Sequence, residues 1–218
     1  MPRCAESGLS DVQDHARFAA AIERIDAANA RDPNRTVVDA VEVPHELHYA
    51  RRMTEWLGRL EPEASEALRL AVRCQHLERW AIPRSEYPMT RAGYHRWRTE
   101  LGAFHARRAA EILREVGYDE ATVARVQALV RKERLKTDAE TQTLEDVACL
   151  VFLEDEAAEF AGRHEEAKVV RILARTWGKM SDRGRAAAMG LELPGRVREL
   201  IAKALESGPG PRDAREGP

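Results

Sequence analysis

The sequence predicts an all-α protein, and two observations carry this prediction. Apolar residues recur with the 3.6-residue period of an amphipathic helix along most of the chain. Prolines stand where several of these segments begin, and a glycine follows the longest of them, as is usual at helix starts and ends. Residues 36–43, which are β-branched, are the one place compatible with extended structure, and no strand pairing is apparent.

The periodicity places eight or nine helices along the chain. They cover about residues 15–29, 44–60, 62–80, 90–116, 120–134, 143–162, 165–180, 181–189 and a last segment that begins at Pro194. Gly117 is expected just past the end of one helix, Asp119 at the N-cap of the next, and Ser181 at a later N-cap. Residues 15–206 are therefore expected to form a single domain, between a frayed N-terminus (1–14) and a disordered Gly/Pro-rich tail (207–218).

Composition narrows the classes of protein to which the chain can belong. The 218 residues are 44% hydrophobic and 33% charged, with a net charge of -2, so nucleic acid is an unlikely partner. The longest apolar run, residues 147–153, is too short to span a membrane, and no signal-peptide pattern is present. Cys74 and Cys149 lie in apolar helical patterns and are expected to be buried free thiols. A cytoplasmic protein is predicted, and a homo-oligomer is compatible with this.

Residues 72–108 hold the best candidate for a functional site. Three of the seven histidines lie there, together with two of the four tryptophans, two of the four tyrosines and many arginines. Such side chains are costly to bury without partners. The segment therefore predicts a polar interior or a binding cleft between helices.

Six polar residues are expected on or beside inward helix faces, namely Glu46, His76, Arg98, His105, Asp146 and Glu154. Imidazole and carboxylate groups are ligands for divalent metals such as Zn, Mn or Fe. The alternative is that each is a satisfied buried group, with His105 bonded to a carboxylate and Arg98 paired with Glu154. A shared site requires the side chains of His76 and His105 to lie within ~10 Å of each other, the reach of one ion or hydrogen bond.

Three stretches, QHLERWAIPRSEYPMTRAGYHRW, RKERLKTDAETQTLEDVACLVFLE and TWGKMS, closely resemble a family filed as domain of unknown function number 4202. The resemblance covers about residues 18–205. It implies no particular activity.

A more distant resemblance is to the HD superfamily of metal-dependent phosphohydrolases, which are all-helical. AVRCQHLERW resembles the His-Asp helix of that superfamily, with His76 at the histidine but Leu77 at the aspartate. FHARRAAEILREVG resembles the later histidine helix, with His105 at the histidine, and LEDVACLVFLED resembles the late acidic segment, with Glu154 at its aspartate. Glu46, or else His45 or His48, would replace the first histidine. The resemblance implies an HD-like helical bundle.

On this resemblance, the chain would be a metal-dependent phosphohydrolase of a small phosphorylated substrate. The metal ligands would be His76, His105 and Glu46, and Asp146 and Glu154 would be catalytic. Ligand contacts would come from Arg84, Tyr94, Arg98 and Lys132. The alternative is a non-catalytic module that binds a small ligand or a protein and has lost the metal pair. The missing aspartate after His76 favours this alternative, whereas the acids at 146 and 154 favour the enzyme.

Overall fold

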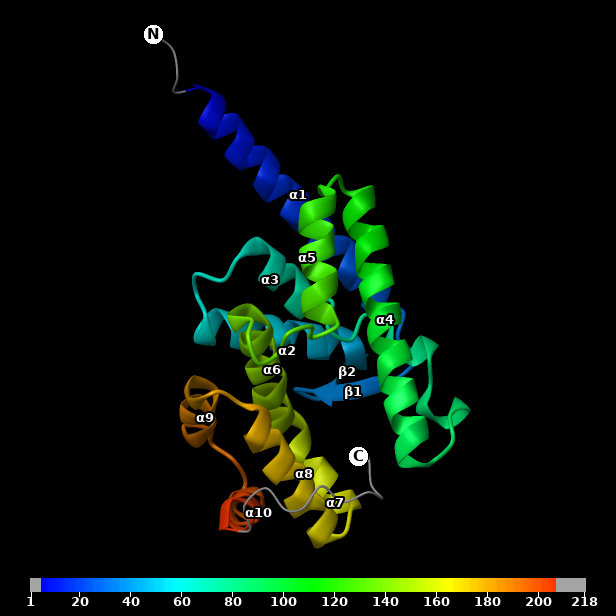
Figure 1. The fold of residues 1–218 in the computed structure, drawn as a ribbon, viewed down its shortest axis with the longest axis vertical. Helices are drawn as coiled ribbons and strands as arrows, with labels where there is room; N and C mark the ends of the chain where they lie inside the picture. Colours follow the sequence, from blue (N-terminus) through cyan, green and yellow to red (C-terminus); the bar gives the residue numbers. More distant parts are fainter. Residues whose placement is uncertain (1–4, 207–218) are drawn as a thin grey trace. The chain divides into compact units, whose positions relative to one another are not determined.

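The computed structural model describes residues 5–206, with side chains from residue 13 onward. This part of the chain contains ten α-helices and one two-stranded hairpin (Figure 1), which confirms the all-α prediction with a slightly higher helix count. The predicted tail, residues 207–218, and the first four residues of the predicted frayed N-terminus lie outside the described range. None of the described helices is both long enough and apolar enough to cross a bilayer.

The chain divides into two compact units, each built from separate stretches. Unit 1 comprises the described parts of residues 1–54, 64–83 and 99–133. Unit 2 comprises the described parts of residues 55–63, 84–98 and 134–218. Two long helices therefore contribute to both units, α2 (His45–Leu60) and α4 (Arg91–Glu115).

Unit 1 contains α1 (Ala5–Asn29), a hairpin, the first part of α2, α3 (Glu66–Arg73), the second part of α4 and α5 (Glu120–Val130). Apolar residues from these helices form its core, and five of its large side chains are almost fully buried: Ile25, Met53, Leu68, Leu113 and Leu129. The predicted link between α4 and α5 is confirmed. Gly117 has a φ of +87°, and the side chain of Asp119 accepts a hydrogen bond from the N–H of Thr122.

The α-helix that begins the chain is longer than predicted. Helix α1 starts at Ala5, whereas periodicity placed its start at residue 15. Its apolar pattern begins at Phe18, so the residues before it carry no periodic signal.

The hairpin corrects the expectation that no strands pair. Strand β1 (Arg35–Val38) runs antiparallel to β2 (Val41–Pro44). Asp39 and Ala40 form the two-residue turn with φ values of +49° and +65°, the left-handed geometry of the turns that match strand twist. This pair is not the Asn-Gly or Asp-Gly that normally marks such a turn, so the turn has no strong local signal in the sequence.

Helix α3 is much shorter than the predicted segment 62–80. Ser65, not Pro62, sets its start, because the Ser65 hydroxyl accepts a hydrogen bond from the N–H of Leu68. The helix ends at Arg73, and turns over residues 74–78 lead into a 3-10 turn at Arg79–Ala81. Helix α5 also ends early, at Val130 rather than residue 134. In both places left-handed residues follow, namely Glu78, Lys132 and Arg134.

Unit 2 contains a 3-10 turn (Arg84–Glu86), the first part of α4, α6 (Ala139–Val151), α7 (Ala157–Arg163), α8 (Glu166–Lys179), α9 (Asp182–Met189) and α10 (Gly195–Glu206). The predicted helix 143–162 is interrupted by a π-helical turn at Phe152–Glu156, and it starts earlier because Asp138 caps residue 141. Ser181 caps α9 as predicted.

Candidate functional site

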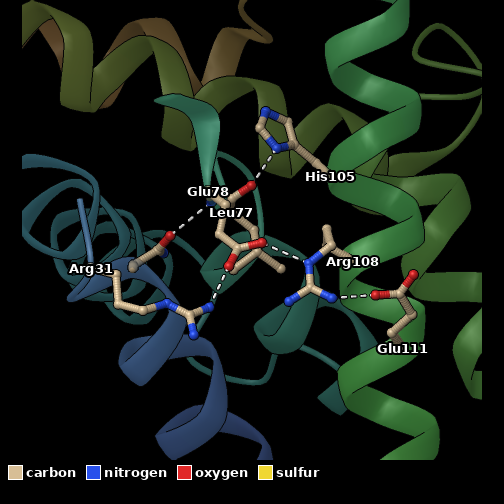
Figure 2. A network of polar contacts seen from close by, with 7 residues as sticks. Arg31, Leu77, Glu78, His105, Arg108 and Glu111 are labelled. Carbon is tan, nitrogen blue, oxygen red and sulfur yellow. Dashed lines mark hydrogen bonds and ion pairs between the residues drawn. The ribbon is translucent and has the colours of Figure 1, made fainter. Parts of the chain in front are cut away.

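The candidate site in unit 1 is built on the turn that follows α3. Glu78 ends this turn with φ 54° and ψ 39°, a left-handed conformation that costs energy for a residue with a Cβ. The backbone N–H of Glu78 donates to Asn29 Oδ1 at 3.0 Å, and its carboxylate accepts from Arg31 and from Arg108, each at 2.6 Å. Figure 2 shows Arg31, which follows α1, and Arg108, on α4, both pointing toward the Glu78 carboxylate. Side chains distant in sequence therefore hold the turn in place.

The negative charge of the Glu78 carboxylate strengthens these contacts. Burial alone would raise the pKa of the Glu78 carboxyl, but the hydrogen bonds from Arg108 and Arg31 outweigh burial and lower that pKa. Arg108 also pairs with Glu111, one turn further along α4. Glu78 is thus ionised at neutral pH and holds two guanidinium groups.

His105 ties the same turn to α4 from its other side. Its Nδ1 donates to the carbonyl oxygen of Leu77 at 2.7 Å (Figure 2), and since a carbonyl only accepts, Nδ1 carries the proton. The His105 ring is buried, and its centroid lies 6.1 Å from that of His76. The two histidines therefore meet the distance condition set by the sequence prediction.

His76 lies at the centre of a cluster that we call the His76 cluster: Glu46, Tyr49, His76, Arg79 and His105. The Glu46 carboxylate is 3.4 Å from Nδ1 of His76, and Nη1 of Arg79 is 3.0 Å from Nε2. The Tyr49 ring stacks on the imidazole, with centroids 4.1 Å apart and planes 11° apart. Because a guanidinium only donates, Nε2 is the acceptor, and Nδ1 carries the proton toward Glu46.

Helix α2 delivers Glu46 and Tyr49 to this cluster. The buried Asp32 carboxylate accepts the backbone N–H of Glu46 at 2.9 Å, which satisfies an N–H in the first turn of α2. Glu46 and Tyr49 are three residues apart, so they share one face of the helix.

Two members of the cluster, His76 and Arg79, reach solvent in part. The Glu46 side chain is 6% exposed, whereas those of His76 and Arg79 are 17% and 30% exposed. The neighbouring Gln75 is buried, and its Oε1 has no hydrogen-bond partner among the described residues. A buried acceptor of this kind can take a hydrogen bond from a ligand or from water.

The residues present do not fit a metal site at His76. Coordination needs the lone pair of an imidazole nitrogen, and the Arg79 guanidinium occupies the space in front of Nε2. Among the side chains that the structure describes, residues 13–206, no group of three or more His, Cys, Asp or Glu is placed to hold a metal ion.

The predicted catalytic acids lie in unit 2, where Asp146 has a clear structural partner. Its buried carboxylate accepts the backbone N–H of Ser181 at 2.8 Å, the Ser181 hydroxyl, and Nε2 of Gln142 at 3.0 Å. A Cβ on Gly184 would lie 2.7 Å from its Cγ. Asp146 therefore holds the N-terminus of α9, and its assignment as a catalytic residue stays a prediction.

Glu154 is half-buried in the π-helical turn of unit 2. Its carboxylate accepts from the indole N–H of Trp56 at 2.6 Å. Arg98 is also half-buried and makes no hydrogen bond or ion pair in the part of the chain that the structure describes. The expected Arg98–Glu154 pair was therefore wrong.

The remaining predicted ligand contacts are held by local structure. Arg84 donates to the carbonyl oxygens of Tyr87 and Pro88 at 2.9 Å each, and its guanidinium lies 6.0 Å from the centroid of the Tyr94 ring. Both Arg84 and Tyr94 belong to unit 2, whereas Lys132 is a half-buried, left-handed residue of unit 1. Their roles as ligand contacts stay predictions.

Three residues that shape the His76 cluster were not predicted from the sequence: Tyr49, Glu78 and Arg79. Tyr49 stands three residues after Glu46, and this helical spacing was an available signal. Arg79 likewise stands three residues after His76. Nothing in the sequence marks Glu78 as left-handed, because glutamate rarely adopts this conformation.

The fold and this cluster define an all-α protein in which a buried carboxylate packs against a partly exposed imidazole and a partly exposed guanidinium group. The chain belongs to the family described as Domain of unknown function (DUF4202), whose model matches residues 19–201, and the predicted family is thereby confirmed. Comparison with curated proteins and with solved structures gives no match. The resemblance to HD phosphohydrolases therefore stays a prediction.

Proposed function

We propose that the chain is a non-catalytic binding module that takes a small phosphorylated molecule at the His76 cluster. The contact between Arg79 and Nε2 of His76, at 3.0 Å, carries this proposal. It places a fixed cation where the phosphohydrolase mechanism would need a metal ion. Of the two functions considered from sequence, this arrangement favours the binding module.

The chemistry of the exposed side of the cluster supports a phosphorylated ligand. Arg79 is the most exposed of its charged members, and a planar guanidinium can donate two parallel hydrogen bonds to phosphate oxygens. The Glu46 carboxylate, 3.9 Å from Nε of Arg79, and the His76 ring orient the guanidinium before a ligand arrives. Less side-chain entropy is then lost on binding.

The rigid turn beneath the cluster supports a binding role as well. Maintaining a left-handed Glu78 requires side chains from several elements, as the contacts of Asn29, Arg31 and Arg108 demonstrate. Backbone strain of this kind gathers at functional sites, where it fixes side-chain positions. Here it fixes His76 and Arg79, which stand on either side of Leu77 and Glu78 in the sequence.

Isothermal titration calorimetry with inorganic phosphate and with para-nitrophenyl phosphate tests the proposal. Arg79→Gln should weaken binding about tenfold or more, because charge-assisted hydrogen bonds are each worth about 1.5–3 kcal/mol. Arg107→Gln is the matched control, since Arg107 is exposed on α4 and makes no hydrogen bond or ion pair within the described residues. The control should bind like the wild type.

Two results would contradict the proposal. One is binding of neither probe, or binding that Arg79→Gln leaves unchanged. The other is release of phosphate from para-nitrophenyl phosphate with added Mn²⁺ that is lost in His105→Gln, which would establish the phosphohydrolase instead. Circular dichroism melts of each variant show whether a lost signal reflects unfolding.

A further inference from the structure

The hairpin of unit 1 exposes apolar surface and open strand edges. Strands β1 and β2 form a two-stranded sheet, so each has one edge without a neighbouring strand in the described structure. Val37, in the middle of β1, is 67% exposed. An open, apolar strand edge is a template for pairing with another chain.

The register of the hairpin shows which backbone groups face outward. Val38 pairs with Val41 across the two-residue turn, and Thr36 pairs with Val43. In such hairpins the residues that flank the turn exchange both backbone hydrogen bonds, and every second pair repeats this pattern. The N–H and C=O groups of Arg35 and Val37 therefore point to the free edge of β1.

The free edge of β2 is less suited to pairing with a strand of another chain. By the same register, Glu42 and Pro44 point outward there. Proline has no N–H to donate, and it is a residue that typically blunts strand edges. Any strand added to this sheet is therefore expected at β1.

Charges at the two ends of the β1 edge are complementary to each other. Arg35 and Asp39 are both exposed, and neither makes a hydrogen bond or ion pair among the described side chains. They stand two residues before and two residues after Val37. Arg35 shares a face of the strand with Val37, and Asp39 is the first residue of the turn. An antiparallel copy of this edge centred on Val37 would bring opposite charges together at both ends.

We propose that two copies of this chain associate through the β1 edges of their hairpins. The two strands run antiparallel around a two-fold axis, with Val37 opposite Val37 of the second copy and Arg35 beside Asp39 of the second copy. Backbone hydrogen bonds and the apolar pair supply the attraction, and the two ion pairs set the register. This inference is independent of the ligand proposed for the His76 cluster.

Sedimentation velocity of the full chain over a range of concentrations tests this interface. The wild type should show a concentration-dependent dimer. Val37→Lys should weaken it about tenfold or more, because like charges directly opposite are unfavourable in a cross-strand pair. Val41→Lys is the matched control, because Val41 is 60% exposed but lies on the other strand, and its dimer should persist.

Charge exchange provides a sharper test of the register. Arg35→Asp alone and Asp39→Arg alone should each weaken self-association, because like charges then meet at both ends. A mixture of the two variants should associate as a heterodimer, since opposite charges meet again. A chain that stays monomeric at all concentrations, or a dimer that is insensitive to Val37→Lys, would overturn the proposal, as would a mixture that fails to associate.

Discussion

Two regions of the molecule bury an acidic side chain, and they do so in different ways. In unit 2, Asp146 accepts hydrogen bonds from the backbone and hydroxyl of Ser181 and from an amide. In unit 1, Glu46 faces the ionisable side chains of His76 and Arg79. The donors to Asp146 are neutral groups at the start of a helix, and they leave no charged group available to a ligand. His76 and Arg79 are ionisable and partly exposed, so they can also bind a ligand. A buried acidic side chain alone is therefore weak evidence for a functional site. The chemistry of its hydrogen-bond and ion-pair partners distinguishes a structural contact from a binding site.

The largest expected effect tests the structural role of Asp146. Gly184→Ala places a Cβ 2.7 Å from Cγ of Asp146, so the carboxylate must move away from the N-terminus of α9. Overpacking of this kind costs up to about 3 kcal/mol of unfolding free energy, measured by urea denaturation. The matched control is Gly178→Ala, where a Cβ on α8 meets nothing within 4 Å. It should stabilise the protein by about 0.5–1 kcal/mol, because alanine is the better helix former. Two substitutions with effects of the same sign and size would contradict this account of Asp146.

Next in size is a pair of substitutions within the His76 cluster. His76→Ala removes the group between Glu46 and Arg79 and should cost about 2 kcal/mol of unfolding free energy, because buried polar groups lose a partner. Glu46→Leu should cost less than His76→Ala, since an apolar side chain of similar size also removes the desolvation cost of the carboxylate. Thermal melts of the two variants compare them directly. If Glu46→Leu melts at the lower temperature, the cluster is more than a set of matched polar contacts.

A smaller effect on the unfolding free energy is expected at Glu78, the last residue of the turn after α3. Glu78→Gln should lower the unfolding free energy at pH 7 by about 1 kcal/mol, because the two arginine contacts lose their charge partner. The folded-state pKa of Glu78 is lowered, so its contribution is complete above the unfolded value of about 4.3 and is lost as pH falls through the folded pKa. The wild type and the variant should therefore converge in stability in strong acid. Urea denaturation at several pH values measures this, and a gap that widens toward low pH would have the wrong sign.

Short-range signals explain which parts of the fold were predictable. Gly117, Asp119 and Ser181 act on backbone groups within a few residues, so the sequence alone places the end of α4 and the starts of α5 and α9. The long apolar stripe likewise places α4 almost correctly.

The end of α3 depends on contacts that no local pattern encodes. Glu78 is held by Asn29, Arg31 and Arg108, which are 49, 47 and 30 residues away in sequence. The helical pattern of the sequence continues through this point, and tertiary contacts override it. The sequence thus predicted that His76 and His105 lie close together, and their ring centroids are 6.1 Å apart, but the Arg79 guanidinium in front of Nε2 of His76 was not foreseen.

Elemental analysis of the full chain, purified without chelator or metal-affinity steps, tests the central claim most directly. The claim is that Arg79, and not a metal ion, faces Nε2 of His76. The account predicts Zn, Mn and Fe well below one equivalent per chain, with the same content in wild type and His76→Gln. One equivalent of any of these metals in the wild type that is lost in His76→Gln would contradict it.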